Sequence, residues 1–347
     1  MRVETEWSIR RYGTEDAELW DRLVAESRQG TLLHMRGYMD YHSDRFRDCS
    51  LIAVRKGKPT AILPADIDQE GTLRSHGGLT YGGWLTPLSH FDGTDMLELF
   101  EAWTSWCREN GIREIIYKAI PHIYHRIPAE EDIYALFRYG ATVETVNLST
   151  VIDLREIPPF NTQQKRHLKK ASARNPWIRE TDCVDEFMPL LQKCLKERHD
   201  AAPVHSGKEL QILKDRFPKG IKLFLAGTGT VPEAAVCIYD TNSVAHCQYI
   251  ATSAAGRQDG VLTYLFHHLI HNVFSARRYF DFGTSNEDAG RILNSGLLHQ
   301  KTGLGGRGAA YQIFRLKPSD LCNLFWLHPT YATFFGCIRQ MQPFLVA

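Results

Sequence analysis

The sequence predicts an α/β protein of two similar domains, each with a mixed sheet flanked by helices. Its 347 residues are about twice the length of a typical single domain. With 43% hydrophobic and 23% charged residues, the chain can build packed cores and does not resemble a disordered one. The succession hairpin, helix, strand occurs twice, at an offset of about 165 to 170 residues, which is typical of a duplicated unit.

The first half contains this unit once. Thr14 is placed to cap a helix, Lys56-Gly57-Lys58-Pro59 has turn chemistry between two β-rich runs, and Gly111 ends a strongly periodic helix. The predicted elements are strands at 6–13 and 113–121, helices from 14, over 35–46 and over 95–110, and a hairpin over 50–67.

The second half repeats the order and begins after a proline-rich join. Pro158 and Pro159 interrupt the pattern before a helix at 161–175, so we expect domains over 1–154 and 155–347. The predicted elements are a hairpin over 221–240, a strand over 243–253, a helix over 259–276 and a strand over 277–283.

Charge and cysteine content narrow the class of protein. A net charge of +1 gives no global field for nucleic acid or membrane, so no DNA partner is expected. The eight cysteines contain no C-x-x-C pair and indicate reduced thiols, and the first 13 residues lack the apolar run of a secretory signal. We therefore expect a cytoplasmic protein.

The uncharged segment 321–338 fits a membrane span poorly, because it includes His328 and Pro329. No transmembrane segment is expected. We expect this segment to dock on the protein, with an interfacial or dimer contact as the alternative.

A turn at 256–262 has the features of a phosphate-binding site. Gly260 lies between a predicted strand and a predicted helix, where a glycine lets the backbone approach a ligand. The free N–H groups at a helix start bind phosphate, and Arg257 would add positive charge. A plain helix N-terminus is the alternative interpretation.

The segment 279–316 is more specific. It runs from a buried strand ending in Asp-Phe-Gly through a helix to Lys-x-Gly-x-Gly and an aromatic strand. With Arg257 and Gly260 of the turn, it resembles the tandem-GNAT, Fem-type family, which includes the aminoacyl-tRNA-dependent transferases of peptidoglycan bridges and related bacterial acyltransferases. Residues 75–84 and 150–175 extend the resemblance over nearly the whole chain.

The resemblance implies two GNAT-like domains, with the donor and the chemistry at the second and the acceptor in a cleft near it. The donor site would comprise Arg257, Gly260, Val261, Leu262, Asn286 and Asn294. The turn departs from the family, because Leu262 stands where a second small residue is expected and Asp259 adds negative charge. For the two asparagines, capping and turn roles are alternatives.

Lys301 corresponds to the lysine of the family's Lys-x-Gly-Phe-Gly segment, although Leu304 replaces the phenylalanine. Its ammonium could stabilise the oxyanion that develops when an amine attacks an acyl carbonyl. A phosphate contact and a solvated loop lysine are the alternatives.

Two further catalytic candidates lie on predicted strands. Tyr249 and His246 lie on the strand that parts from its neighbour in GNAT folds, and a spacing of three predicts that only one faces the cleft. We favour Tyr249. Asp281 ends the next strand, where it could orient a proton acceptor or the acceptor amine, or instead bond to the backbone.

Acceptor-binding residues are expected around the glycines of the first half and in the loop 197–210. The resemblance points to Arg36, Tyr38, His76 and Tyr81 in the first half, and Arg198, His199 and His205 lie in the loop.

Two patterns that could indicate other functions, a histidine pair and a basic helix, are weak. His267 and His271 share a helix face but have no third ligand nearby, so no metal site is expected. The basic residues of the helix at 161–175 favour a solvated face, with a phosphate or RNA track as the alternative; they are Lys165, Arg166, Lys169, Lys170 and Arg174.

The sequence thus predicts an N-acyltransferase without a permanently bound cofactor. Acyl-CoA is slightly favoured as co-substrate over aminoacyl-tRNA, since the net charge is near zero. The acceptor would be an amine of a small molecule, a sugar or a cell-envelope precursor. A non-catalytic ligand-binding protein with the same fold is the alternative from another class. The oligomeric state is not readable from the sequence.

Overall fold

The computed structural model describes residues 6–319, apart from the side chains of Arg198 and His199. The predicted docking of segment 321–338 therefore lies outside the described residues. The strands are β1 (Trp7–Arg11), β2 (Leu51–Arg55), β3 (Lys58–Leu63), β4 (Asp66–Ile67), β5 (Thr72–Arg74), β6 (Glu114–Lys118), β7 (Thr142–Asp153), β8 (Trp177–Thr181), β9 (Ile221–Gly227), β10 (Ala234–Asp240), β11 (Val244–Thr252), β12 (Tyr279–Thr284), β13 (Asn286–Glu287), β14 (Ile292–Leu293) and β15 (Arg307–Leu316).

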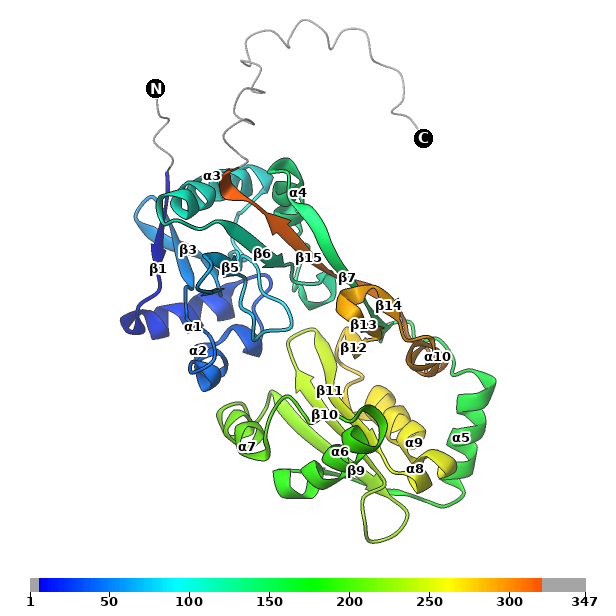
Figure 1. Ribbon diagram of the computed structural model, residues 1–347. Coiled ribbons are helices and arrows are strands. Elements are labelled where there is room, and N and C mark those ends of the chain that lie inside the picture. Colours follow the sequence, from blue (N-terminus) through cyan, green and yellow to red (C-terminus); the bar gives the residue numbers. More distant parts are fainter. Residues whose placement is uncertain (1–5, 320–347) are drawn as a thin grey trace, which may run out of the picture.

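Helices cover the sheets, as Figure 1 shows. The α-helices are α1 (Ala17–Glu26), α2 (Arg36–Met39), α3 (Gly93–Glu109), α4 (Glu131–Arg138), α5 (Thr162–Ser172), α6 (Val184–His199), α7 (Gly207–Arg216), α8 (Ala254–Asp259), α9 (Val261–His268) and α10 (Ser295–Gly303). Short 3₁₀ turns are η1 (Thr14–Asp16), η2 (Leu32–His34), η3 (Asp40–His42), η4 (His122–Tyr124) and η6 (Asp288–Gly290), and η5 (Leu269–Val273) is a π-helical turn. No helix among the described residues is long and apolar enough to cross a membrane.

The first half forms from the local signals of its sequence. Lys56 and Gly57 both have positive φ in the two-residue turn between β2 and β3, as a tight hairpin requires. Asp92 caps α3 by accepting from the N–H groups of Thr94 and Asp95. The predicted cap at Thr14 is wrong, because Gly13 holds the N-cap position of η1. The predicted helix over 35–46 is only α2 followed by η3.

The repeated order is present in the structure. β2 and β9 begin at Leu51 and Ile221, and β6 and β12 begin at Glu114 and Tyr279. In both halves a helix connects two parallel strands, α3 between β5 and β6 and α8–α9 between β11 and β12. The duplication read from the sequence therefore corresponds to a repeated structural unit.

One ten-stranded sheet runs through both halves, in the order β4-β5-β6-β15-β7-β12-β11-β10-β9-β8. β7 pairs with β15 along most of its length and with β12 at its end. β15, the last described strand of the chain, also pairs with β6 of the first half. The division at residues 154 and 155 stays a prediction, and the structure adds that residues 307–316 are hydrogen-bonded into the sheet of the first half.

Three clusters of buried apolar side chains hold the molecule together. One surrounds Trp84 and Trp103 in the first half, and another surrounds Phe266 and Phe280 under α9. The third contains side chains from both halves, including Ile120 and Tyr239. Because this shared core lies on one face of the central sheet, it brings loops of the first half to the middle strands of the second.

Candidate active site

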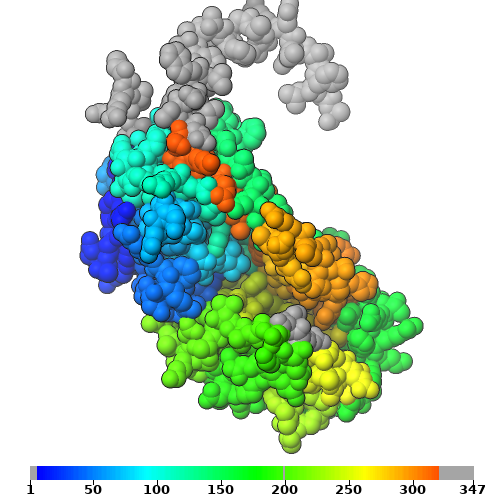
Figure 2. All heavy atoms as spheres, in the orientation of Figure 1, coloured from blue at the N-terminus to red at the C-terminus, as the bar shows by residue number. Residues whose placement is uncertain are grey.

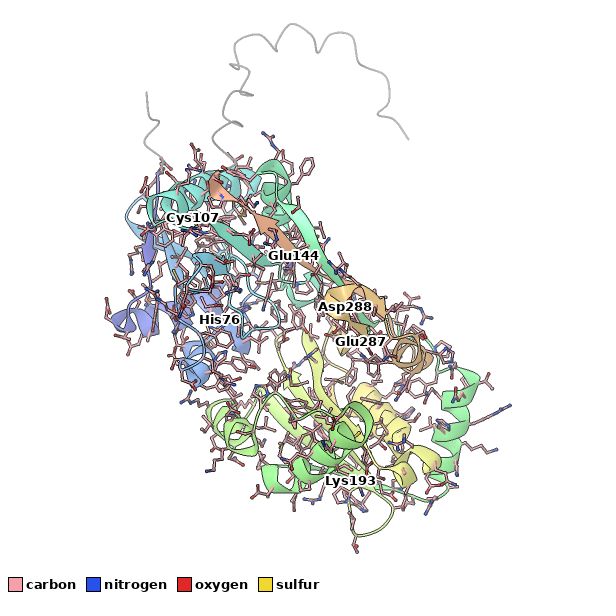
Figure 3. The ribbon with its side chains drawn as sticks, in the orientation of Figure 1. His76, Cys107, Glu144, Lys193, Glu287 and Asp288 are labelled. Atoms are coloured by element: carbon pink, nitrogen blue, oxygen red, sulfur yellow. The ribbon has the colours of Figure 1, made fainter. Side chains whose placement is uncertain are left out.

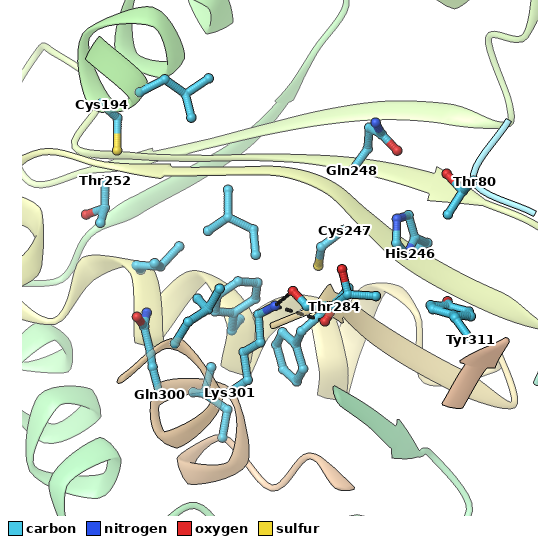
Figure 4. Close-up of a pocket in the computed structure, with 18 residues that line it drawn as sticks. Thr80, Cys194, His246, Cys247, Gln248, Thr252, Thr284, Gln300, Lys301 and Tyr311 are labelled. Carbon is cyan, nitrogen blue, oxygen red and sulfur yellow. Dashed lines mark hydrogen bonds between the residues drawn. The ribbon is translucent and has the colours of Figure 1, made fainter. Parts of the chain in front are cut away.

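β11 and β12 part in the middle of the sheet. They pair in parallel over only three residues, Val244–His246 with Tyr279–Asp281, although both strands continue beyond this point. A cavity of about 400 Å³ opens there, with Gln248, Ile250 and Phe282 among its lining residues (Figure 4). The parting strands thus create a site that a regular ladder would have closed.

A β-bulge sets the direction of the side chains at this site. Cys237 of β10 pairs with Tyr249 and Ile238 pairs with Cys247, so Gln248 is an extra residue in β11. His246 pairs with Tyr239, two residues from Cys237, and therefore lies on the same face of β11 as Tyr249. The prediction that a spacing of three separates their faces is wrong, because the bulge resets the alternation.

The cavity is lined by side chains from both faces of the sheet. Leu262 and Phe266 belong to the core under α9, whereas Cys194 belongs to the core shared with the first half. Thr80, from the loop between β5 and α3, also lines it. The cavity therefore connects the two faces, and the surface is hollowed where the blue first half, the green α6–α7 segment and the orange α10 segment meet (Figure 2).

His246 and Asp281 form a hydrogen-bonded pair where β11 and β12 part. The Nδ1 atom of His246 lies 2.7 Å from Oδ2 of Asp281, whose side chain is fully buried, and His246 lines the cavity. Four other groups donate to the carboxylate: Ser149 Oγ at 2.5 Å, the Gly283 N–H at 2.9 Å, Tyr311 OH at 2.6 Å and Tyr124 OH at 3.0 Å.

Burial opposes the charge on Asp281, but His246 and the hydroxyl donors outweigh it and hold the pKa of the carboxyl below its usual range. An ionised carboxylate only accepts hydrogen bonds, so His246 donates its Nδ1–H to Asp281. The Nε2 atom is then left as a proton acceptor. Such a pair has the chemistry of a general base.

Lys301 lies in a helix and not in the loop that its glycine neighbours suggested. It is buried in the last turn of α10, where its ammonium donates to the carbonyls of Gly283 at 2.9 Å and Thr284 at 2.7 Å (Figure 4). Burial lowers the pKa of Lys301 to about 8, against the attraction of Asp281. Because an ammonium has three donors, one N–H remains for a ligand in the cavity that Lys301 lines.

Tyr249 and His205, which the sequence assigned to catalysis and to substrate binding, contact each other. The Tyr249 hydroxyl lies 2.6 Å from Nδ1 of His205 and accepts from the His205 backbone N–H at 3.1 Å. Burial raises the pKa of Tyr249 to about 12 and lowers that of His205 to about 4. Neither residue is among those that line the cavity.

A second cavity, of about 260 Å³, adjoins the first at the predicted phosphate turn. Arg257 and Gly260 line it together with Gln163 and His167 of α5, and Leu262 lines both cavities. Five lining residues are common to the two cavities: Thr252, Leu262, Phe266, Gln300 and Leu304. The predicted donor turn and the His246 site therefore belong to one continuous cleft.

The turn itself differs from the prediction. Ser253 caps the additional helix α8 by accepting from the Gly256 N–H, and Gly260 has φ +75° between α8 and α9. Arg257 is exposed on α8 and donates to the carbonyl of Thr252 at 2.8 Å. Val261, by contrast, is fully buried in the core and does not line the cleft.

Asp259 does not face this cleft as an uncompensated charge. Its carboxylate forms ion pairs with Lys170 of α5, at 3.1 Å, and with Arg174, which lies just after the end of α5. Two cations of the basic segment 165–174 therefore neutralise the acidic residue that departs from the family's turn.

Asn286 and Asn294 have structural partners. Asn286 accepts from the Leu148 N–H at 2.5 Å, and Asn294 caps α10 by accepting from the Leu297 N–H at 2.9 Å. Neither lines either cavity. The capping interpretation describes Asn294, whereas Asn286 links β13 to β7 and to the carbonyl of Gly290.

Arg36, Tyr38 and His76 are buried away from the cleft. Arg36 forms ion pairs with two carboxylates of the first half, and the Tyr38 hydroxyl lies 3.4 Å from that of Tyr239. His76 packs against His42 on the side of the first half that faces α7 (Figure 3), and burial lowers its pKa to about 3. None of the three lines the large cavity.

Tyr81 is buried and packs on Tyr124, with ring centroids 4.3 Å apart, so it lies one side chain away from Asp281. Its neighbour Thr80 lines the cavity. Arg198 and His199 end α6, and their side chains lie outside the described part of the structure.

Residues 160–289 match the family model described as an acetyltransferase (GNAT) domain. By this match, residues 160–289 form a GNAT domain. This GNAT domain includes the parting strands, the bulge and the turn at 256–262. No curated protein matches the chain in sequence.

Solved structures resemble most of the chain at low sequence identity. FemX has a TM-score of 0.64 at 10% identity, and the match covers 91% of this chain and 99% of FemX. L-PGS from Bacillus licheniformis has a TM-score of 0.58 at 11% identity, covering 89% and 93%. The C-terminal domain of a putative lysylphosphatidylglycerol synthetase from Agrobacterium fabrum has a TM-score of 0.57 at 12% identity, covering 90% and 94%. At these identities the likeness establishes the fold.

Sequence reasoning missed several residues of this site. His246 was set aside for Tyr249, and nothing in the pattern predicted the bulge at Gln248. Tyr311 lies on β15, the aromatic strand at the end of the segment 279–316, but the sequence did not single it out. Tyr124 is 157 residues from Asp281, and only the tertiary fold brings the two together.

Proposed function

We propose that this protein transfers an acyl group from acyl-CoA to an amine, with His246 as the general base. The observation that carries this proposal is the His246–Asp281 pair at the parting of β11 and β12, because it sets a proton acceptor in a cleft that connects both faces of the sheet. The GNAT match of residues 160–289 supports an acyl donor on the α9 side.

The side chains of the cleft account for the bond changes. The acceptor nitrogen attacks the thioester carbonyl carbon, forming a C–N bond, while its proton passes to Nε2 of His246. The C–S bond breaks, and CoA leaves as a thiolate that takes up a proton. Negative charge grows on the carbonyl oxygen during attack, and the remaining N–H of Lys301 stabilises it.

The two substrates would enter from opposite faces. Arg257 and the start of α9 favour the phosphates of the donor in the smaller cavity, where Asp259 is already neutralised by α5. Thr80 and Gln248 offer a hydroxyl and an amide to the acceptor near His246. This arrangement keeps the acyl carbon and the amine within reach of one base.

Aminoacyl-tRNA is the weaker donor hypothesis. Of the five Lys and Arg residues at 165–174, Lys170 and Arg174 are paired with Asp259, which leaves Lys165, Arg166 and Lys169 for an RNA backbone. With a net charge of +1, the chain offers little further attraction for a polyanion of that size.

A binding and turnover experiment tests the proposal. Thermal shift measurements would compare acetyl-CoA, longer acyl-CoAs and an aminoacyl-tRNA mimic, because a ligand bound at 100 times its Kd stabilises the native state by about 2.7 kcal/mol. Release of CoA thiol would then be followed with a panel of amines. We expect His246→Gln to keep acyl-CoA binding and to lose at least a hundredfold in transfer rate.

The outcomes separate the hypotheses. Stabilisation by the tRNA mimic alone would favour the aminoacyl donor. Stabilisation by acyl-CoA with unchanged transfer in His246→Gln would remove the base assignment. Stabilisation by neither donor would favour a non-catalytic binding protein and overturn the proposal.

A further inference from the structure

We infer that Tyr124, a residue of the first half, is a positioning residue that sets the strength of the base in the second half through its hydrogen bond to Asp281. The inference rests on the proposed role of His246. It gives the first half a part in proton transfer, in addition to lining the cleft through Thr80.

Tyr124 is rigidly held where it meets the carboxylate. It is the last residue of η4, follows Pro121 closely and is only 2% exposed. Its hydroxyl lies 3.0 Å from Oδ2 of Asp281 and 3.0 Å from the Tyr311 hydroxyl. The ring packs on Tyr81, so neither the ring nor the hydroxyl is free to turn away.

The two oxygens of Asp281 have different numbers of hydrogen-bond donors. Oδ1 accepts from Ser149 and from the Gly283 N–H. Oδ2 faces three donors, namely His246, Tyr311 and Tyr124. A carboxylate has about four acceptor positions, roughly two on each oxygen, so the tyrosines compete with His246 for Oδ2.

This competition has a definite sign. Each hydroxyl that donates to Oδ2 disperses its negative charge and weakens its hold on the imidazolium proton. Removing the Tyr124 hydroxyl would leave more of that charge for His246, which would then keep its proton to higher pH. The other titratable groups close to the pair stay in place in such a variant: Tyr311 on β15, Tyr81 on the loop after β5, Cys247 on β11 and Lys301 on α10.

A matched pair of variants tests the inference. Tyr124→Phe removes the hydroxyl that reaches Asp281. Tyr117→Phe removes a hydroxyl that donates to another buried aspartate of the first half, Asp132, at 2.7 Å, and has no contact with Asp281. Both delete a buried tyrosine hydroxyl that donates to a buried carboxylate; Tyr117→Phe also leaves the Trp84 N–H without its acceptor, and Tyr124→Phe also removes the contact with Tyr311.

The readout is the ring signals of His246 by NMR in the full-length chain with labelled histidine, assigned from their loss in His246→Gln. We expect Tyr124→Phe to move the titration midpoint of these signals upward by about half a pH unit, and the acidic limb of the transfer rate to move with it. Tyr117→Phe should leave both unchanged.

Failure of the inference and failure of the proposed function give different results. If Tyr124→Phe is folded and the midpoint does not move, or if Tyr117→Phe moves it equally, the inference is overturned while the base assignment stands. If His246→Gln transfers acyl groups at the full rate, the proposed function fails whatever the NMR result.

Discussion

A methyl group at Gly260 would lie 2.4 Å from the main-chain oxygen of His167. This close approach means that α5 packs directly on the turn between α8 and α9. Gly260, which is expected to let the backbone approach a phosphate, also lets α5 pack closely on the turn. Its role in folding can therefore be tested separately from its role in binding.

Gly260→Ala should therefore be strongly destabilising. The residue has φ +75°, which strains an L side chain, and the added carbon meets backbone that cannot rotate away. We expect a loss of about 2 to 4 kcal/mol in the free energy of unfolding, measured by urea titration. Gly229→Ala is the control, since nothing lies within 4 Å of its Cβ position. Equal effects of the two changes would contradict the packing argument.

Asp132 should make the protein lose stability as pH rises. Burial raises the pKa of its carboxyl from 3.8 to about 6, against the hydrogen bond from Tyr117, so the unfolded chain ionises first. Between pH 4 and pH 6 the folded state holds a proton that the unfolded state has released, which lowers stability by about 3 kcal/mol in total across that window.

Asp132→Asn should remove this decline, and urea titrations at pH 4, 5 and 7 would reveal it as a flatter profile. Glu130→Gln, an exposed neighbour, should keep the slope of the parent protein. If the stability of Asp132→Asn declined with pH as steeply as that of the parent protein, the carboxyl would have the same pKa in the folded and unfolded states, and the prediction would be wrong.

His34 should act in the opposite direction over an overlapping pH range. Complete burial lowers its pKa from 6.5 to about 3, so the unfolded chain takes up a proton below pH 6.5 while the folded protein does not. Stability should therefore fall with decreasing pH, by about 2 kcal/mol from this residue at pH 5. His34→Asn should reduce the fall between pH 7 and pH 5, whereas His90→Asn, at an exposed site, should leave it unchanged.

Lys301→Met should affect both folding and turnover. The change leaves the carbonyls of Gly283 and Thr284 without their donor, which costs about 1 to 3 kcal/mol in the free energy of unfolding. In the parent protein the transfer rate should fall above pH 8, as the ammonium loses its proton, and this limb should be absent from the residual activity of the variant. Lys193→Met, at an exposed position on α6, is the control for both measurements. A falling limb that persists in Lys301→Met would assign it to another group.

The local sequence predicted most of the secondary structure but little of the candidate active site. Turn residues such as Gly57 and Gly111, and the repeated order of elements, predicted the hairpins, the long helices and the duplication. The alternation of a strand is a local rule, and it failed at Gln248 because the bulge depends on pairing with β10. Tyr124 could not be found by any local rule, since the distance that matters spans 157 residues.

The position of β15 has a consequence for how the chain folds as it is synthesised. β6 and β7 are made early, yet they have no direct contact in the sheet until residues 307–316 enter between them. When the first half has been synthesised, the position between β6 and β7 is still empty, because β15 has not yet been made. Domains usually fold in the order in which they are made, but here the earlier half can complete its sheet only after the last described strand has emerged.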